Sequence, residues 1–254
     1  MSYHINNNDG IITFTIERED KRNAINDEVM EGFKEVIHTI RNNSDIRILV
    51  VTGSGEKAFC SGGDLSEFHK LHTEQEAYGM LSKMGNILYE LATLPVPTIA
   101  LVNGAAVGGG CEIATACDFR LVERQAKCGF IQGKLAITSG WGGGTYLYES
   151  GMKKDFILKM LVDGSTYDSD KLYEIGWATR VYDGPKEQEL EDFIKNMKKI
   201  DPSVLHAYKE IKLRSWIEKN MYERVMEEIK RCAKLWESEV HYEAVQSFLN
   251  KSNK

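Results

Sequence analysis

Two glycine-rich stretches, residues 59–64 (FCSGGD) and 108–112 (GGGCE), carry the residue types best suited to chemistry in this chain. Each follows an apolar run rich in β-branched residues, at 48–52 and at 98–102. Such a run is typical of a buried strand, and glycine lets the backbone after it bend and approach a ligand closely. We therefore expect two backbone bends, each at the carboxyl end of a strand.

The two bends could present a pair of backbone N–H groups to one oxygen atom. Gly63 closes the first loop, and Gly109 lies where a helix is expected to begin, so its N–H lacks a partner within the helix. Two such donors would stabilise the oxyanion of a thioester enolate, each by roughly 3–4 kcal/mol. The alternative, from the residues alone, is two unrelated tight turns.

A carboxylate, Glu112, follows the second bend directly. It would lie one turn into the expected helix, close to the oxyanion, where it could move a proton at the carbon next to the carbonyl. The alternative for a Glu in a first helical turn is that it only complements the helix dipole.

The elements that must position these groups alternate between strands and helices along the first half of the chain. Such alternation predicts βαβ units and a largely parallel sheet covered by helices. The strands are expected at 10–16, 46–52, 98–102, 118–122 and 127–131, with helices at 26–40, 73–94 and 109–117. After about residue 142 helices dominate, with amphipathic segments at 187–200, 203–216 and 220–249, the last expected to be more than one helix.

Composition restricts the class of partner. The formal charge of −6 argues against nucleic acid or an anionic membrane as the main partner. A chain of 254 residues can bury one large core, or one core with a helical appendage. The five cysteines include no C-x-x-C pair, which indicates reduced thiols and no metal site. No signal peptide or membrane span is predicted, so we expect a cytoplasmic protein.

Motifs for other kinds of site are missing from the sequence. There is no G-x-G-x-x-G after a strand, no P-loop and no G-x-S-x-G nucleophile elbow. A dinucleotide cofactor and serine-hydrolase chemistry are therefore not expected.

Four stretches together resemble the enoyl-CoA hydratase/isomerase (crotonase) superfamily. They are residues 21–26, 57–65, 102–112 and 140–143, they occur in the order and spacing of that family, and the resemblance covers roughly residues 10–185. It implies an α/β fold, a spiral of ββα repeats with a C-terminal helical trimerisation region. The implied division is a core at 1–190 that binds acyl-CoA and a helical region at 191–254.

The resemblance also implies a substrate and the residues that bind it. The substrate would be an acyl-CoA thioester with no separate cofactor and no metal, and the assembly a homotrimer or a dimer of trimers. Gly63 and Gly109 would form the oxyanion hole, with Glu112 as the catalytic carboxylate. The residues implied in CoA binding are Lys21, Arg22, Ala24, Ser61, Gly63, Asp64 and Leu65.

One catalytic position departs from the pattern of the family's hydratases. They use a second glutamate twenty residues after the first, and here that position is Gln132. An amide can hydrogen-bond a water molecule or an acyl group, but it cannot relay a proton at neutral pH. We therefore expect hydration, or a double-bond shift, of a 2-enoyl-CoA with Glu112 as the single carboxylate and Gln132 orienting the water.

Two alternatives remain at this point. Residues 114–121, 130–132 and 141–143 are similar to the ethylmalonyl-CoA decarboxylase branch, and decarboxylation of an ethylmalonyl- or methylmalonyl-type thioester needs no second carboxylate. Glu112 would repel the carboxylate of such a substrate unless a cation compensates. The other alternative is a non-catalytic binding protein, for which a damaged oxyanion loop or a missing Glu112 is expected, and both are intact.

Overall fold

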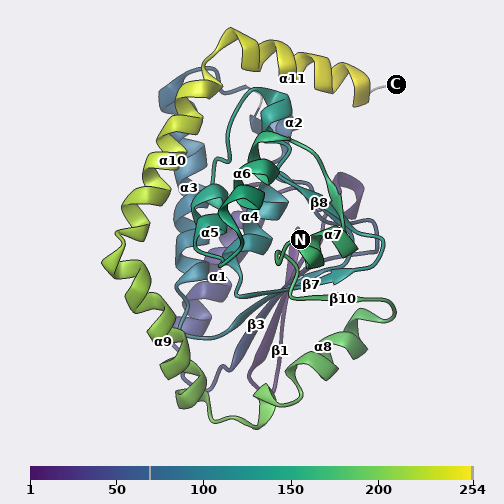
Figure 1. The fold of residues 1–254 in the computed structure, drawn as a ribbon, viewed down its shortest axis with the longest axis vertical. Coiled ribbons are helices and arrows are strands. Elements are labelled where there is room, and N and C mark those ends of the chain that lie inside the picture. The colour runs from purple at the N-terminus through teal and green to yellow at the C-terminus, as the bar shows by residue number, and fades with distance from the viewer. Residues whose placement is uncertain (69, 253–254) are drawn as a thin grey trace.

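Three strands of one sheet are each followed by a short strand of a second sheet (Figure 1). The computed structural model describes residues 1–68 and 70–252. A helix follows each such pair of strands, so the repeat is ββα, as the resemblance implies. The pairs are β3 (Ile48–Gly53) with β4 (Ala58–Cys60), β5 (Thr98–Val102) with β6 (Ala105–Val107), and β7 (Phe119–Glu123) with β8 (Lys127–Gly129).

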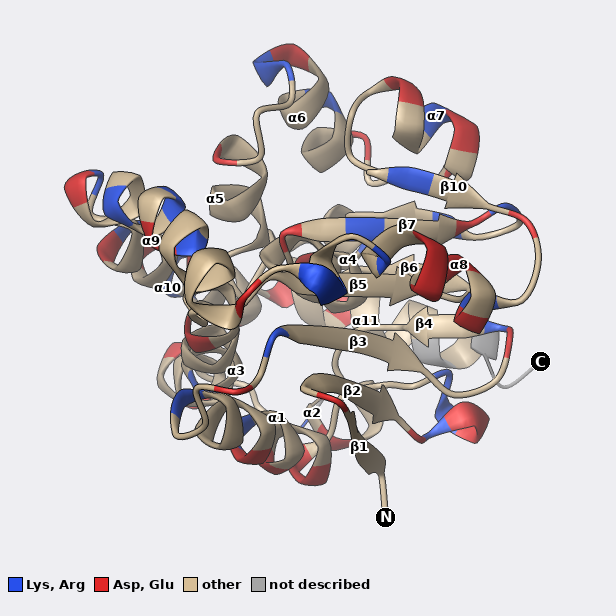
Figure 2. Cartoon of the chain, turned by 90° about the horizontal axis from the view of Figure 1, so that it is seen from below, with Lys and Arg blue, Asp and Glu red and all other residues tan. Residues whose placement is uncertain are grey.

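The first sheet has the strand order β1-β2-β3-β5-β7-β10. β1 (Tyr3–Asn8) and β2 (Ile11–Ile16) pair antiparallel, and the remaining pairs, out to β10 (Arg180–Tyr182), are parallel. Strands β3 and β5 carry no charged residues (Figure 2). This is the pattern of parallel strands that are buried on both faces.

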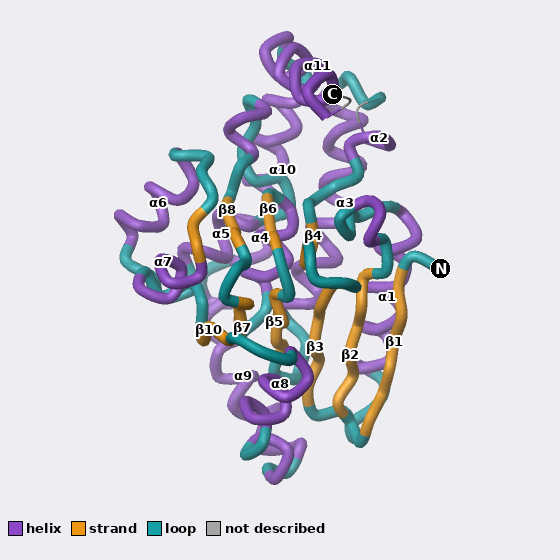
Figure 3. The backbone as a smooth tube through the Cα atoms, turned by 90° about the vertical axis from the view of Figure 1, so that its right-hand side faces the viewer, coloured by secondary structure: helices purple, strands orange, loops and turns teal. Residues whose placement is uncertain are grey.

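The second sheet corrects the expectation of one largely parallel sheet. It has the order β4-β6-β8-β9, in which β9 (Tyr167–Asp168) is antiparallel to β8 and the other pairs are parallel (Figure 3). The strand expected at 127–131 ends at Gly129. The two glycine-rich bends follow strands of this second sheet, β4 and β6, and not the longer strands of the first.

The core lies on both faces of the first sheet because successive residues of a strand point to opposite sides. Leu49 and Val51 of β3 belong to the larger core, shared with α1 (Asp27–Arg41) and α3 (Glu74–Ala92). Ile48 and Val50 pack in the smaller core, together with Ile194 of α8 (Lys186–Ile194).

Local signals explain where the first long helices begin. The side chain of Asn26 accepts a hydrogen bond from the N–H of Val29 (3.0 Å), which confirms the expected N-cap of α1. Thr73 and Glu76 form a capping box at the start of α3, and the helix ends before Pro95.

The C-terminal part of the chain is helical, and the segment expected at 220–249 is two helices. α9 (Pro202–Glu218) and α10 (Met221–Trp236) follow one side of the molecule, with α10 packed along α3, and α11 (Glu239–Ser252) crosses one end (Figure 1). The expected region 191–254 extends past these helices, since residues 253 and 254 lie outside the described residues. The shorter helices are α2 (Leu65–Phe68), α4 (Gly109–Ala116), α5 (Gly143–Tyr148), α6 (Lys154–Val162) and α7 (Ser169–Glu174). Among the helices described, none is both long and apolar enough to cross a bilayer.

Candidate active site

The two glycine-rich bends meet, because the strands that precede them, β4 and β6, are paired in parallel. A Cβ atom added to Gly62 would lie 3.1 Å from the backbone N of Gly109, and one added to Gly110 would lie 2.0 Å from the carbonyl oxygen of Cys60. Side chains at these positions would force the two bends apart. Gly62 also has a φ of +95°, a conformation that glycine adopts without strain.

The backbone amides of Gly63 and Gly109 are the free donors of the two bends. Among the hydrogen bonds between described residues, neither of these N–H groups donates one, whereas the N–H of the next residue, Asp64, donates to the carbonyl of Ile25 (2.9 Å). Gly109 is the first residue of α4, so its N–H lies at the positive end of the helix dipole.

A cavity of about 70 Å³ connects the two bends with the candidate catalytic side chains. Gly63 and Gly109 line it together with Glu112 and Gln132. Most of the remaining lining is apolar and includes Met80, Leu81, Ile137, Trp141, and Trp236. The structure thus brings the predicted oxyanion donors and the predicted catalytic residues to one small, largely apolar site.

The carboxylate of Glu112 is buried and accepts four hydrogen bonds. Its Oε1 accepts from the Nε2 of Gln132 (2.9 Å) and from the N–H of Gly140 (3.1 Å). Its Oε2 accepts from the N–H groups of Trp141 and Gly143, both at 2.8 Å. Three of these donors are backbone amides of the segment 140–143, where a loop runs into α5, so the chain fixes the carboxylate in place beside the cavity.

Two opposing effects set the pKa of Glu112, which is raised to about 7. Burial is the largest cause, and the negative charge of Glu228 adds to it, because both disfavour the ionised form. The backbone hydrogen bonds from Gly143, Trp141 and Gly140 lower the pKa and offset part of the effect. A carboxyl group with a pKa near 7 can both accept and return a proton at neutral pH.

The amide of Gln132 uses only one of its two ends on the protein. Its Nε2 donates to Glu112, while its Oε1 is buried and has no hydrogen-bond partner among the described residues. This orientation follows from the charge of Glu112, since an ionised carboxylate accepts hydrogen bonds and does not donate them. The Oε1 atom is therefore available to accept from a water molecule or a ligand in the cavity.

The side chain of Trp141 covers both glycine bends. A Cβ atom on Gly109 would lie 2.1 Å from its Cζ3 atom, and one on Gly63 would lie 3.5 Å from its Cζ2 atom. The indole is 4% exposed and forms a wall of the cavity. The indole of Trp141 therefore narrows the cavity next to the amides of Gly63 and Gly109. Nothing in the sequence indicated this contact.

The residues predicted to bind CoA lie on two adjoining segments, 21–24 and 61–65. Backbone hydrogen bonds join them, from the N–H of Ser61 to the carbonyl of Arg22 (3.1 Å) and from the N–H of Ile25 to the carbonyl of Gly62 (2.8 Å). Lys21 and Arg22 are exposed, Ser61 and Leu65 are half-buried, and Ala24 is buried.

Asp64 is placed differently from the other residues of this group. Its carboxylate forms a buried ion pair with Arg18 (2.8 Å) and accepts a hydrogen bond from the N–H of Ser66 (3.0 Å). Arg18 also donates to the carbonyl of Ala24 (2.7 Å). The side chain of Asp64 thus ties the two segments to each other and is turned away from solvent.

Glu228 of α10 is a further residue of the site that sequence reasoning missed. It accepts hydrogen bonds from the N–H groups of Gly144 (2.9 Å) and Thr145 (2.7 Å) and from the hydroxyl of Ser139. Its position one residue before the buried Ile229, on an amphipathic helix, was the available signal, because a charge beside an apolar stripe needs a partner.

Comparison with known proteins settles the family. The sequence profile of the enoyl-CoA hydratase/isomerase family matches residues 6–254. The chain belongs to this family. Solved structures support its fold: an enoyl-CoA hydratase from Bacillus halodurans superposes with a TM-score of 0.88 at 19% identity, covering 97% of this chain and 100% of that one. The predicted α/β fold with ββα repeats is confirmed.

Curated relatives in the enoyl-CoA hydratase/isomerase family carry more than one kind of name. Mouse (Mus musculus) methylglutaconyl-CoA hydratase is 30% identical over 71% of this chain and 57% of its own length. The short-chain-enoyl-CoA hydratase of Clostridium acetobutylicum is 35% identical over 67% of this chain and 65% of its own. The ethylmalonyl-CoA decarboxylase of Bos taurus is 31% identical over 80% of this chain and 67% of its own length. The match thus spans little more than half of the mouse protein. Because the relatives include both hydratases and a decarboxylase, their names do not identify the reaction of this chain.

Proposed function

We propose that this chain hydrates a short 2-enoyl-CoA, with Glu112 as its single catalytic carboxylate and the amides of Gly63 and Gly109 as the oxyanion hole. The observation that carries the proposal is that one cavity joins these two amides to a buried carboxyl group whose pKa is about 7. The amides supply donors where negative charge develops, and the carboxyl group supplies a proton carrier beside the acyl carbons.

The reaction balances with one carboxylate. Glu112 takes a proton from water as the water oxygen forms a bond to C3 of the enoyl group. The electrons of the C2–C3 double bond then shift toward the thioester carbonyl, whose oxygen becomes the enolate oxyanion held by Gly63 and Gly109. Glu112 finally returns its proton to C2, which gives a 3-hydroxyacyl-CoA. The same proton carrier could shift a double bond between neighbouring carbons.

Gln132 has a positioning role in this scheme. Its Nε2 holds the Oε1 of Glu112, and its own unpartnered Oε1 would accept the second O–H of the attacking water. An amide cannot take up a proton, so all proton transfer falls to Glu112.

For the rest of the substrate, we propose that the segments 21–24 and 61–65 bind CoA. The exposed Lys21 and Arg22 would bind phosphate, while Ala24, Ser61, Gly63 and Leu65 line the adenine end. Asp64 contributes through its ion pair with Arg18, which joins the two segments.

Decarboxylation of a malonyl-type thioester is the second candidate, favoured by the similarity to ethylmalonyl-CoA decarboxylase. The electrostatics of the cavity disfavour it. Among the described residues that line the cavity, none is Lys, Arg or His, so a substrate carboxylate would face Glu112 without a compensating cation. A non-catalytic role is disfavoured because both bends and Glu112 are in place.

We further propose a homotrimer or a dimer of trimers, in which the core at 1–190 binds acyl-CoA and the helical region at 191–254 assembles the subunits. One observation supports this: Val204, Tyr208 and Ile211 of α9 are exposed and follow one helix face.

The cysteines are free and buried, which fits a reducing compartment such as the cytoplasm. The acidic net charge gives no support for a nucleic-acid partner, and no membrane partner is proposed.

The experiment that tests the function offers crotonyl-CoA, a 3-enoyl-CoA and ethylmalonyl-CoA separately and identifies the products by mass spectrometry. Addition of one water to crotonyl-CoA, lost in Glu112→Gln by about 10²–10⁴-fold, is the expected result. Loss of carbon dioxide from ethylmalonyl-CoA, with no hydration of crotonyl-CoA, would replace the proposal with the decarboxylase assignment.

A further inference from the structure

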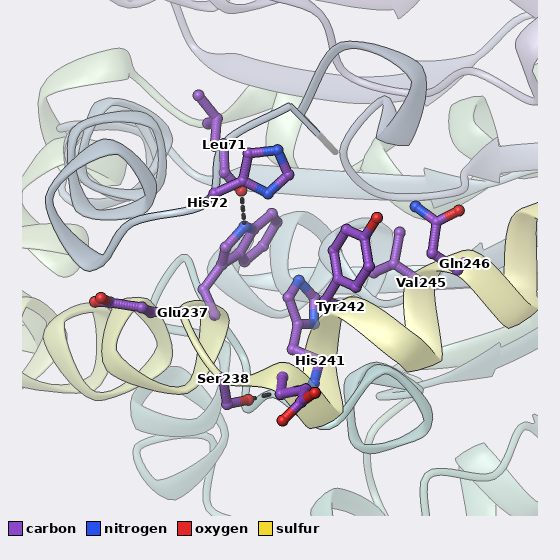
Figure 4. A pocket seen from close by; sticks show the side chains of 10 residues that line it. Leu71, His72, Glu237, Ser238, His241, Tyr242, Val245 and Gln246 are labelled. Atoms are coloured by element: carbon purple, nitrogen blue, oxygen red, sulfur yellow. Dashed lines mark hydrogen bonds between the residues drawn. The ribbon is translucent and has the colours of Figure 1, made fainter.

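Trp236 separates two cavities. This tryptophan is the last residue of α10, and it lines the 70 Å³ cavity of the candidate active site. It also lines a second cavity of about 230 Å³, between the segment at Leu71 and His72 and the start of α11. Figure 4 shows Leu71 and His72 on one side of this second cavity, with His241, Tyr242 and Val245 of α11 opposite.

The indole of Trp236 is held on two sides. Its Nε1 donates to the carbonyl oxygen of Leu71 (3.0 Å), and its ring packs against the ring of His241, with 4.6 Å between the centroids. The Nδ1 of His241 hydrogen-bonds in turn to the carbonyl of Leu135 (2.6 Å). Trp236 is 7% exposed. With its polar atom bonded and its face covered, it forms a fixed wall.

The cavity on the catalytic side of this wall is small. Its 70 Å³ is about half the roughly 150 Å³ of an apolar cavity that accommodates benzene. The space between the two amides and Trp236 therefore suits a short acyl group. The second cavity is larger, and its lining includes the apolar residues Leu71 and Val245 and the ring of Tyr242.

We propose that Trp236 sets the acyl-chain limit of this enzyme, so that short unbranched acyl-CoA thioesters bind and chains of about eight carbons do not. The second cavity is the space that a longer chain would enter if the indole were removed. This inference rests on the proposed acyl-CoA function, and it concerns only the far end of the acyl group, away from Glu112 and the two glycine amides.

The test measures binding of saturated acyl-CoA thioesters, which undergo no hydration, so its readout is independent of turnover. Butyryl-CoA and octanoyl-CoA are titrated into the full-length protein by calorimetry, and wild type is compared with Trp236→Ala. Wild type is expected to bind butyryl-CoA at least about tenfold more tightly than octanoyl-CoA. Trp236→Ala is expected to gain at least about tenfold in affinity for octanoyl-CoA, with butyryl-CoA changed by less than about threefold.

Two further variants keep the outcome interpretable. Trp236→Leu retains an apolar side chain at the wall and replaces Trp236→Ala in the test if that variant does not fold. It is expected to show a smaller gain in affinity for octanoyl-CoA. Val245→Phe fills the second cavity, so in the Trp236→Ala background it is expected to reverse the gain. Trp216→Ala, which removes an equally buried indole from α9, is the matched control and is expected to keep the wild-type preference.

Equal binding of both thioesters by wild type would overturn the proposal, and so would an unchanged preference in folded Trp236→Ala and Trp236→Leu. Failure of wild type to bind either thioester would instead overturn the proposed acyl-CoA function, and the chain-length inference with it.

Discussion

Glu112 and Glu228 both accept hydrogen bonds from one segment, residues 139–145, which runs from a loop into the first turn of α5. Glu112 accepts hydrogen bonds from the N–H groups at positions 140, 141 and 143, and Glu228 accepts from those at 144 and 145 and from the hydroxyl of Ser139. One carboxylate comes from α4 in the core and the other from α10 in the C-terminal region. This segment therefore couples the charge of the C-terminal helix to the candidate catalytic group.

This coupling predicts a pH shift. Glu112 must be ionised to take a proton from water, so the kcat/KM of wild type should fall below a pH of about 7. The charge of Glu228 raises the pKa of Glu112, so Glu228→Gln should move this acid limb to lower pH. Glu227→Gln, at the exposed neighbouring position, is the control and should leave the limb in place. A shift to higher pH would show that loosening of the segment 139–145 dominates over the lost charge.

Gln132 gives a second prediction, which separates orientation from proton transfer. Gln132→Ala removes the contact to the Oε1 of Glu112 and the acceptor for water, so hydration should slow by about 10–100-fold yet persist. Gln132→Glu places a second carboxylate about 3 Å from Glu112, where two like charges cannot both ionise easily. Its rate maximum should therefore move relative to wild type. The measurement is the pH–rate profile of crotonyl-CoA hydration, and complete loss of activity in Gln132→Ala would contradict a purely orienting role.

The sequence predicted the parts of the structure that local patterns determine. Asn26 marked the start of α1 and the β-branched run at 98–102 matched β5, whereas the two glycine bends follow the short strands β4 and β6 and not the runs at 48–52 and 98–102. The second sheet could not be predicted from the sequence, because β4 and β6 have three residues each, too few to show an alternating pattern of apolar residues. These strands form because neighbours far away in the sequence pair with them.

The surroundings of the site depended on contacts between distant residues. The glycine-rich start of α5 has low helix propensity, and Glu228, more than eighty residues further along the chain, accepts the hydrogen bonds of its first turn. Likewise, no local pattern could show that Trp141 lies against Gly109 or that Trp236 reaches the cavity. The candidate catalytic residues could be named from the sequence, but the shape of the space around them could not.

The packing of Trp141 predicts unequal effects at the two glycine amides. A Cβ on Gly109 would lie 2.1 Å from the rigid indole, whereas a Cβ on Gly63 would lie 3.0 Å from the ring of Phe68. Gly109→Ala should therefore destabilise the fold by about 1–3 kcal/mol, and Gly63→Ala by clearly less. Thermal unfolding measures both. Trp141→Ala in the Gly109→Ala background should recover part of the loss, and strictly additive effects would show that the two residues do not clash.

Asp118 predicts how the stability of the fold depends on acid. It directly precedes β7, and Lys209 and Lys212 of α9 contact its carboxylate, joining the C-terminal helices to the core. Burial alone would raise the pKa of Asp118, but the two ammonium groups outweigh burial and lower it to about 2. The unfolded chain, with an ordinary Asp pKa near 4, therefore takes up the proton first as the pH falls.

The sign of the effect follows from this difference in pKa. The ionised carboxylate of Asp118 contributes about 2 kcal/mol to the free energy of unfolding. This contribution is present above pH 4 and is lost as the pH falls toward 2. Asp118→Asn should be less stable than wild type at pH 7, because Lys209 then loses a buried partner. The difference between the two proteins should shrink between pH 4 and pH 2. Denaturant unfolding at several pH values measures it, with the exposed Asp155→Asn as the control. A difference that stays constant down to pH 2 would mean that the ion pair contributes nothing to stability.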